Sequence, residues 1–181
     1  MLQSDWSLAW SAEELMEIPA ELLHQYPPKA RSFLADFGMP RQVAIDAITT
    51  VTLEPICCLL EALVEDDYDD LASQLVIGEM DIDGGALLLC VMDAERETVG
   101  LFDPDCHDPV IFVNSDLGLF ARSLLRAHQL QQRVSEGETL SADDIDRLSL
   151  DLQTIDPVAL CDETCYWSGN VEFQRHTLNY G

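Results

Sequence analysis

The pattern of hydrophobic positions divides this chain into a helical beginning, a strand-rich middle and a helical remainder. Leucines and aromatic residues recur at helical spacing before Gly38, whereas short apolar and β-branched runs follow one another over residues 42–113. Helical spacing returns after Ser115. Because the strands are grouped and the long helices follow them, instead of alternating with them, the pattern predicts an α+β fold.

The first forty residues predict a series of short helices. Ser11 and Glu14 have the spacing of a capping box, so a helix is expected from Ala12. Pro19 is expected to break this helix, which then restarts at Ala20. The next helix is predicted over residues 29–37, because Gly38 and then Pro40 stop it.

The middle of the chain predicts strands joined by turns. Residues 42–45 alternate between polar and apolar, residues 48–53 are rich in β-branched side chains, and residues 56–63 fit either a strand or a short helix. The next apolar run, Leu75–Ile77, is followed by Gly78, and Asp83-Gly84-Gly85 is a turn signal. Ala86–Met92 is continuously apolar, which predicts a central strand covered on both faces. Two later runs, 98–103 and 110–113, complete the predicted strands.

A long amphipathic helix is predicted after residue 115. Ser115 is expected to cap it by accepting a hydrogen bond from the first turn, with Asp116 favouring the positive helix end. One face of this helix carries apolar residues and a histidine at helical spacing: Leu117, Phe120, Ala121, Leu124, Leu125 and His128.

Two further helices are predicted beyond it. Ser141 is placed to cap a helix with Ile145, Leu148 and Leu152 directed inward. Asp156 and Pro157 are typical of a short helix start. The tail over residues 165–181 fits either an edge strand or a segment packed on the core.

Charge is the strongest departure from an average composition. The chain has 34 acidic residues and nine lysines and arginines, a formal net charge of −25. Between Glu61 and Asp108, fifteen acidic residues meet one base, Arg96. Such a surface repels phosphate backbones, so direct binding of nucleic acid is not expected. It attracts basic proteins, although solubility or a host-wide acidic bias would produce the same composition.

The remaining composition predicts one cytoplasmic domain over residues 1–181, with its core at about residues 12–170. Apolar residues make up 48% of the chain, but no apolar run approaches the roughly 20 residues of a membrane span. The first residues also lack the basic and apolar regions of a signal peptide. A membrane partner is therefore not expected.

Catalytic and metal-binding motifs are largely missing from the sequence. The Cys106–His107 pair, within a turn rich in aspartate, is the best candidate for a nucleophile and its base. Cys161 and Cys165 offer one weak zinc-ligand pair, and residues 81–84 lack the later glutamate of a calcium loop. We therefore expect no cofactor, no metal and no enzymatic activity.

Several segments in order resemble the SUKH superfamily of immunity proteins, which are related to a yeast cell-wall synthesis regulator. Ile18–Pro19 followed by FLADFGMP (residues 33–40) is similar to the opening motif of that superfamily, with Met39 where leucine is common. The similarity continues through LVIG (75–78), residues 85–93, TVGLFD (98–103) and FVNS (112–115). Residues 41–70 could not be aligned.

The resemblance implies a mostly antiparallel sheet flanked by helices, and an immunity protein that neutralises a cognate basic toxin, such as a nuclease or a deaminase. No catalytic residue is implied. Two alternatives are a general scaffold or regulatory binding module, and a small hydrolase using Cys106 and His107. The acidic charge predicts partner-binding residues in three turns: Asp66, Asp67, Tyr68, Asp69, Asp70, Asp81, Asp83, Asp103, Asp105 and Asp108.

Overall fold

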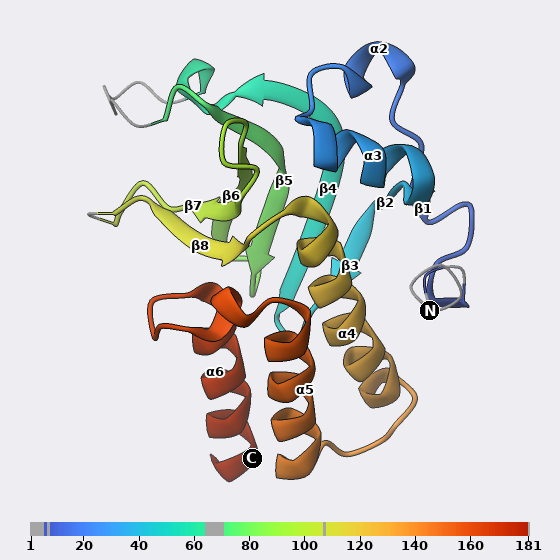
Figure 1. Ribbon diagram of the computed structural model, residues 1–181. Coiled ribbons are helices and arrows are strands. Elements are labelled where there is room, and N and C mark those ends of the chain that lie inside the picture. The colour runs from blue at the N-terminus through green and yellow to red at the C-terminus, as the bar shows by residue number, and fades with distance from the viewer. Residues whose placement is uncertain (1–5, 7, 64–70, 107, 181) are drawn as a thin grey trace.

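The computed structural model describes the chain except for residues 1–5, 7, 64–70, 107 and 181 (Figure 1). Its centre is a six-stranded sheet in which each strand pairs antiparallel with the next, in the order β3-β4-β5-β6-β7-β8, beside a small β1-β2 sheet. The strands are β1 (Leu15–Met16), β2 (Met39–Pro40), β3 (Gln42–Ala44), β4 (Thr49–Leu59), β5 (Gln74–Ile82), β6 (Ala86–Asp93), β7 (Val99–Phe102) and β8 (Val110–Asn114).

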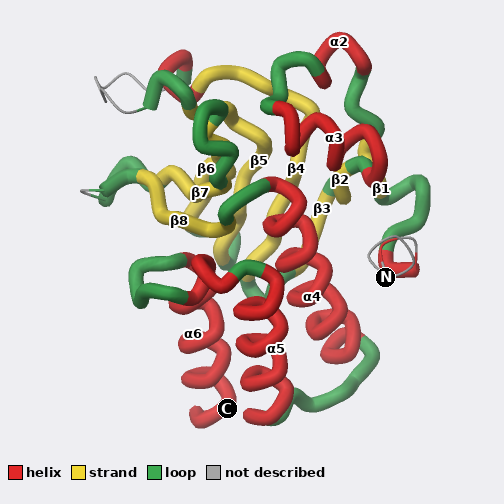
Figure 2. The backbone as a smooth tube through the Cα atoms, viewed as in Figure 1, coloured by secondary structure: helices red, strands yellow, loops and turns green. Residues whose placement is uncertain are grey.

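Helices precede and follow the sheet, and the long ones pack against one of its faces (Figure 2). The helices are α2 (Ala20–Leu23), α3 (Pro28–Phe37), α4 (Leu117–Ser135), α5 (Ala142–Ile155) and α6 (Tyr166–Tyr180), with short 3₁₀ turns η1 (Leu60–Ala62) and η2 (Pro157–Leu160). Alternate residues of the strands, such as Val51, Met80 and Cys90, join the helices in the main core. The architecture confirms the predicted α+β class with an antiparallel sheet and flanking helices.

The predicted helix from Ala12 is wrong. The Ser11 backbone N–H does donate to Glu14 Oε2 (2.8 Å), but this bond closes a turn instead of starting a helix. Leu15 then pairs with Pro40 in the small sheet. Strand pairing with a segment 25 positions away has therefore overridden the local capping signal. The periodicity of residues 11–18 alone does not indicate this pairing.

The middle strands are longer than predicted. The strand β4 spans Thr49–Leu59, with an irregular register between Leu53 and Cys58, and the 3₁₀ turn η1 follows it. For residues 56–63, the predicted strand and the predicted short helix are therefore each confirmed in part. Gly78 lies inside β5 at another irregularity. A Cβ at Gly78 would stand 2.3 Å from the carbonyl oxygen of Thr52. Glycine here permits the close approach of β4.

The apolar strand β6 is central, as predicted, but it is not covered on both faces along its length. From Cys90 onward its side chains are fully buried. Leu87 is 59% exposed, and Leu88 and Leu89 are half-buried. On the helix-free side, the small second core of Leu60, Leu71, Val76, Val91 and Phe102 covers one end of the sheet and leaves the other end open.

Two predictions for the C-terminal half need correction. The cap of α4 is Asp116, whose Oδ1 accepts a hydrogen bond from the Leu119 N–H (2.8 Å), and not Ser115. The tail is the helix α6, so the edge strand is wrong, whereas the alternative of a segment packed on the core is confirmed by the burial of Trp167 and Val171. The predicted capping box at Ser141 and the inward residues of α4 and α5 are confirmed.

A buried carboxylate joins these C-terminal elements. Asp156, 2% exposed, accepts hydrogen bonds at Oδ2 from Asn114 Nδ2 (3.1 Å) and the Ser115 N–H (2.7 Å), and at Oδ1 from Ser115 Oγ (3.0 Å) and the Val158 N–H (3.3 Å). Asn114 Oδ1 in turn accepts from Trp167 Nε1 (3.0 Å). The end of β8, the start of η2 and the helix α6 therefore share one polar network.

Replacing Asp156 by alanine should lower the free energy of unfolding by about 3 kcal/mol, because several buried donors lose their acceptor at once. Urea denaturation followed by circular dichroism measures this loss. Asp108→Ala, in an exposed turn, is the matched control and should change stability by less than about 0.5 kcal/mol. A loss below about 1 kcal/mol for Asp156→Ala would show that the network is not a main support of the fold.

Candidate functional site

The end of β5 and the turn that follows it carry two of the predicted binding residues, Asp81 and Asp83, and both are exposed. Asp81 Oδ1 accepts a hydrogen bond from the Gly84 N–H (2.8 Å), so its carboxylate also shapes the turn. Asp83 adopts a left-handed conformation (φ 56°), and its N–H donates to the Ile48 carbonyl (2.7 Å). Both carboxylates therefore project from a backbone that the hydrogen bond to Ile48, in the β3–β4 turn, holds in place.

The turn between β7 and β8 carries three more. Asp103 is half-buried and accepts hydrogen bonds from the Asp105 N–H (3.0 Å) and from Cys106 Sγ (3.3 Å). Asp105 and Asp108 are exposed. This turn projects away from the β5–β6 turn in Figure 1, so the structure does not gather these carboxylates into one cluster. Asp66, Asp67, Tyr68, Asp69 and Asp70 lie outside the described residues.

Cations and anions are distributed unevenly over the fold. The C-terminal helices hold most of the ion pairs found among the described residues: Arg126 with Asp151, Arg133 with Asp144 (2.9 Å) and Glu138 (2.7 Å), and Arg175 with Asp146 (2.7 Å). By contrast, no lysine or arginine occurs between Arg41 and Arg96, the stretch that forms β3 to β6. The sheet side is therefore strongly negative, with an ion pair between Arg96 and Asp93 at the end of β6, whereas the helix side neutralises much of its own charge.

The thiol of Cys106 is exposed but is not activated as a nucleophile. Its hydrogen bond to Asp103 raises its pKa, and the negative charges of Asp103 and Asp105 raise it further. A reactive thiolate needs the opposite environment, with cations or N–H donors nearby. His107, the base predicted for it, lies outside the described residues. The surroundings of Cys106 thus disfavour the hydrolase hypothesis.

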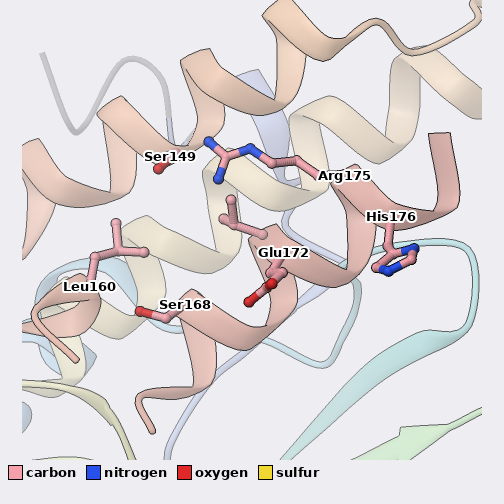
Figure 3. Close-up of a pocket in the computed structure, with 7 residues that line it drawn as sticks. Ser149, Leu160, Ser168, Glu172, Arg175 and His176 are labelled. Carbon is pink, nitrogen blue, oxygen red and sulfur yellow. The ribbon is translucent and has the colours of Figure 1, made fainter. Parts of the chain in front are cut away.

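The cleft between α5, η2 and α6 has a volume of about 660 Å³, and Figure 3 shows the residues that line it. Arg175 reaches from α6 toward Ser149 of α5 and forms its ion pair with Asp146 there. His176 lies well away from Ser149 and Ser168 in this view. A nucleophile and a base must approach within hydrogen-bonding distance, and these side chains do not converge in that way.

The other histidine and cysteine candidates serve packing. His128 stacks on Trp10 with ring centroids 4.3 Å apart, and burial lowers its pKa. Cys90 is fully buried, which raises its pKa to about 12. Cys165 is buried next to Val158. Within the described part of the chain, no group of three or more potential metal ligands occurs.

Comparison with known proteins gives one decisive result. The model of the SUKH-4 immunity protein family matches residues 5–173, nearly the whole chain. The chain belongs to the SUKH-4 immunity protein family. This confirms the resemblance to the SUKH superfamily and supports a role in immunity. No curated protein and no solved structure matches the chain. Over the described residues, the SUKH-4 fold has no helix long and apolar enough to cross a membrane.

Sequence reasoning missed one set of surface residues in this SUKH-4 domain. On the face of the sheet away from the helices, Glu79 and Asp81 of β5 lie directly opposite Leu89 and Leu87 of β6. Of these four residues only Asp81 was predicted as a partner contact; the alternation Glu79-Met80-Asp81-Ile82 is typical of a half-buried strand and could have indicated Glu79 as well.

Replacing Asp103 by asparagine should increase the alkylation rate of Cys106 by iodoacetamide at pH 8 by roughly threefold to tenfold. The carboxylate raises the thiol pKa, so removing its charge increases the thiolate fraction at any pH below that pKa. Mass spectrometry of the Cys106 peptide measures the rate, and Cys161 in the same sample serves as the internal reference. Asp83→Asn is the control variant. Equal rates in both variants and the wild type would contradict this assignment.

Proposed function

We propose that this SUKH-4 protein is the antidote to a cognate basic toxin, which it binds and neutralises through its acidic surface. Nuclease and deaminase toxins fit best, because their active-site clefts attract phosphate and therefore attract carboxylates as well. The family supports the immunity role. The distribution of charge supports the acidic surface: β3 to β6 contribute carboxylates and no lysine or arginine.

Masking is the proposed mechanism. Carboxylates on rigid turns occupy the positions that substrate phosphates take in the toxin, and the toxin is inhibited for as long as the complex persists. The proposed contacts are Asp66, Asp67, Tyr68, Asp69, Asp70, Asp81, Asp83, Asp103, Asp105 and Asp108. Long-range attraction accelerates the encounter by roughly 10- to 1000-fold at low ionic strength. Shape and short-range contacts then set the lifetime of the complex.

A general binding module is the second candidate. An exposed acidic surface of this kind also fits a scaffold with several basic partners. A genome neighbourhood without a toxin gene would favour this alternative. Neutralisation of one toxin in a stoichiometric complex would favour the immunity role.

Co-expression with the toxin encoded next to this gene should restore growth of cells that the toxin alone kills. The association rate of the purified pair should fall steeply as salt is raised, because the Debye length shortens to about 8 Å at 0.15 M. Reversing Asp105 and Asp108 to lysine should slow association at low salt by about tenfold.

The control is the same double reversal on the helix side, Glu136→Lys with Glu172→Lys, which gives an identical net charge. Reversal of Asp66, Asp67, Asp69 and Asp70 forms a third arm. If the two double variants associate at one common rate, net charge and not the acidic turns accounts for the attraction. If the unaltered protein neither binds the toxin nor restores growth, the proposed function is wrong.

A further inference from the structure

The helix-free side of the sheet carries an ordered array of acidic and apolar side chains. We define the outer face as six residues of β4, β5 and β6: Thr50, Thr52, Glu79, Asp81, Leu87 and Leu89. The strand registers arrange them in two rows. One row pairs Thr52 with Glu79 and Glu79 with Leu89, and the other pairs Thr50 with Asp81 and Asp81 with Leu87.

The exposure of the two leucines is unusual for a central strand. An antiparallel sheet with one face in water normally alternates apolar residues inward with polar residues outward. The strand β6 keeps leucine at both positions of the outer face; Leu87 is 59% exposed and Leu89 half-buried. The second core includes Val91 further along the same strand and packs against one side of Leu89, so Leu87 is the leucine that it leaves uncovered. Exposed apolar side chains on a rigid strand, flanked by charge, are typical of an interface centre.

Charge restricts what can cover this face. Asp81 and Leu87 are direct cross-strand neighbours, as are Glu79 and Leu89, and such neighbours have Cβ atoms roughly 5 Å apart. Lysine and arginine combine an apolar stem with a cationic head. One such side chain can lay its methylene groups on a leucine and direct its head to the facing carboxylate. Neither row of the outer face contains a cation of its own.

A second copy of this chain is a poor occupant. Face-to-face pairing would bring Glu79 and Asp81 of one copy against the same carboxylates of the other. The formal net charge of −25 per chain adds repulsion at longer range.

We propose that the outer face is the docking surface for the cognate toxin, and that it binds a protein surface on which lysine or arginine side chains lie beside apolar ones. This inference rests on the proposed function and refines it. The outer face adds apolar contacts, which lengthen the lifetime of the complex, to the carboxylate contacts proposed above.

Calorimetric titration of a catalytically inactivated toxin, encoded by the adjacent gene, into the full chain tests the proposal. Leu87→Arg and Glu79→Lys should each weaken binding by about tenfold or more, since each places a cation against the basic partner. Leu150→Arg on α5 is the matched control for the first, because Leu150 is 62% exposed. Glu136→Lys at the end of α4 is the control for the second. Both controls should bind within about twofold of the wild type.

The experiment distinguishes a wrong docking surface, a wrong proposed function and a dimer of this chain. Equal binding of the outer-face variants and the wild type would overturn the docking surface while leaving the immunity role intact. No binding by the wild type would refute the proposed function itself. If sedimentation shows a wild-type dimer that Leu87→Arg dissociates, a second copy covers the face and the proposal is wrong. Leu87→Gln, which adds no charge, replaces Leu87→Arg if circular dichroism shows that the arginine variant does not fold.

Discussion

The fold depends on one buried carboxylate that connects elements far apart in the sequence. Asp156 holds the end of β8 through Asn114 and Ser115, and it holds the start of η2 through the Val158 N–H. Asn114 also accepts a hydrogen bond from Trp167, so the same network includes α6. Because a buried charge without partners is strongly unfavourable, these contacts constrain the C-terminal helices to one position against the sheet.

Acidic residues have two separate structural roles in this protein, one in the interior and one at the surface. Asp46, Asp93 and Asp156 are buried and accept backbone N–H bonds that close turns. Asp83, Asp105 and Asp108 are exposed in the hairpin turns. Buried aspartates thus stabilise the turns next to the strands, and exposed aspartates give the surface its negative charge. Arg126, Arg133 and Arg175 of the C-terminal helices form ion pairs with acids of those helices or their connection, so the two sides of the domain differ in net charge.

Predictability differs between segments for physical reasons. The helices α3, α4 and α5 were predicted closely because their signals, Gly38, the amphipathic spacing and the Ser141 capping box, act within a few residues. The helix α6 was not, since its burial depends on contacts of Trp167 with β8. Ser115 was assigned as a cap because it stands at a helix start, but its hydroxyl donates to Asp156, 41 residues away.

For the candidate site, the sequence alone determined the charge, the acidic turns and the resemblance to a family, because composition and short motifs are local properties. It did not determine where these charges lie relative to one another. Strand order and register placed Glu79 and Asp81 opposite Leu89 and Leu87, and separated the β5–β6 turn from the β7–β8 turn. Cross-strand pairing joins residues through hydrogen bonds between different strands, and a one-residue shift would move every side chain to the other face. Only the tertiary structure fixes that register.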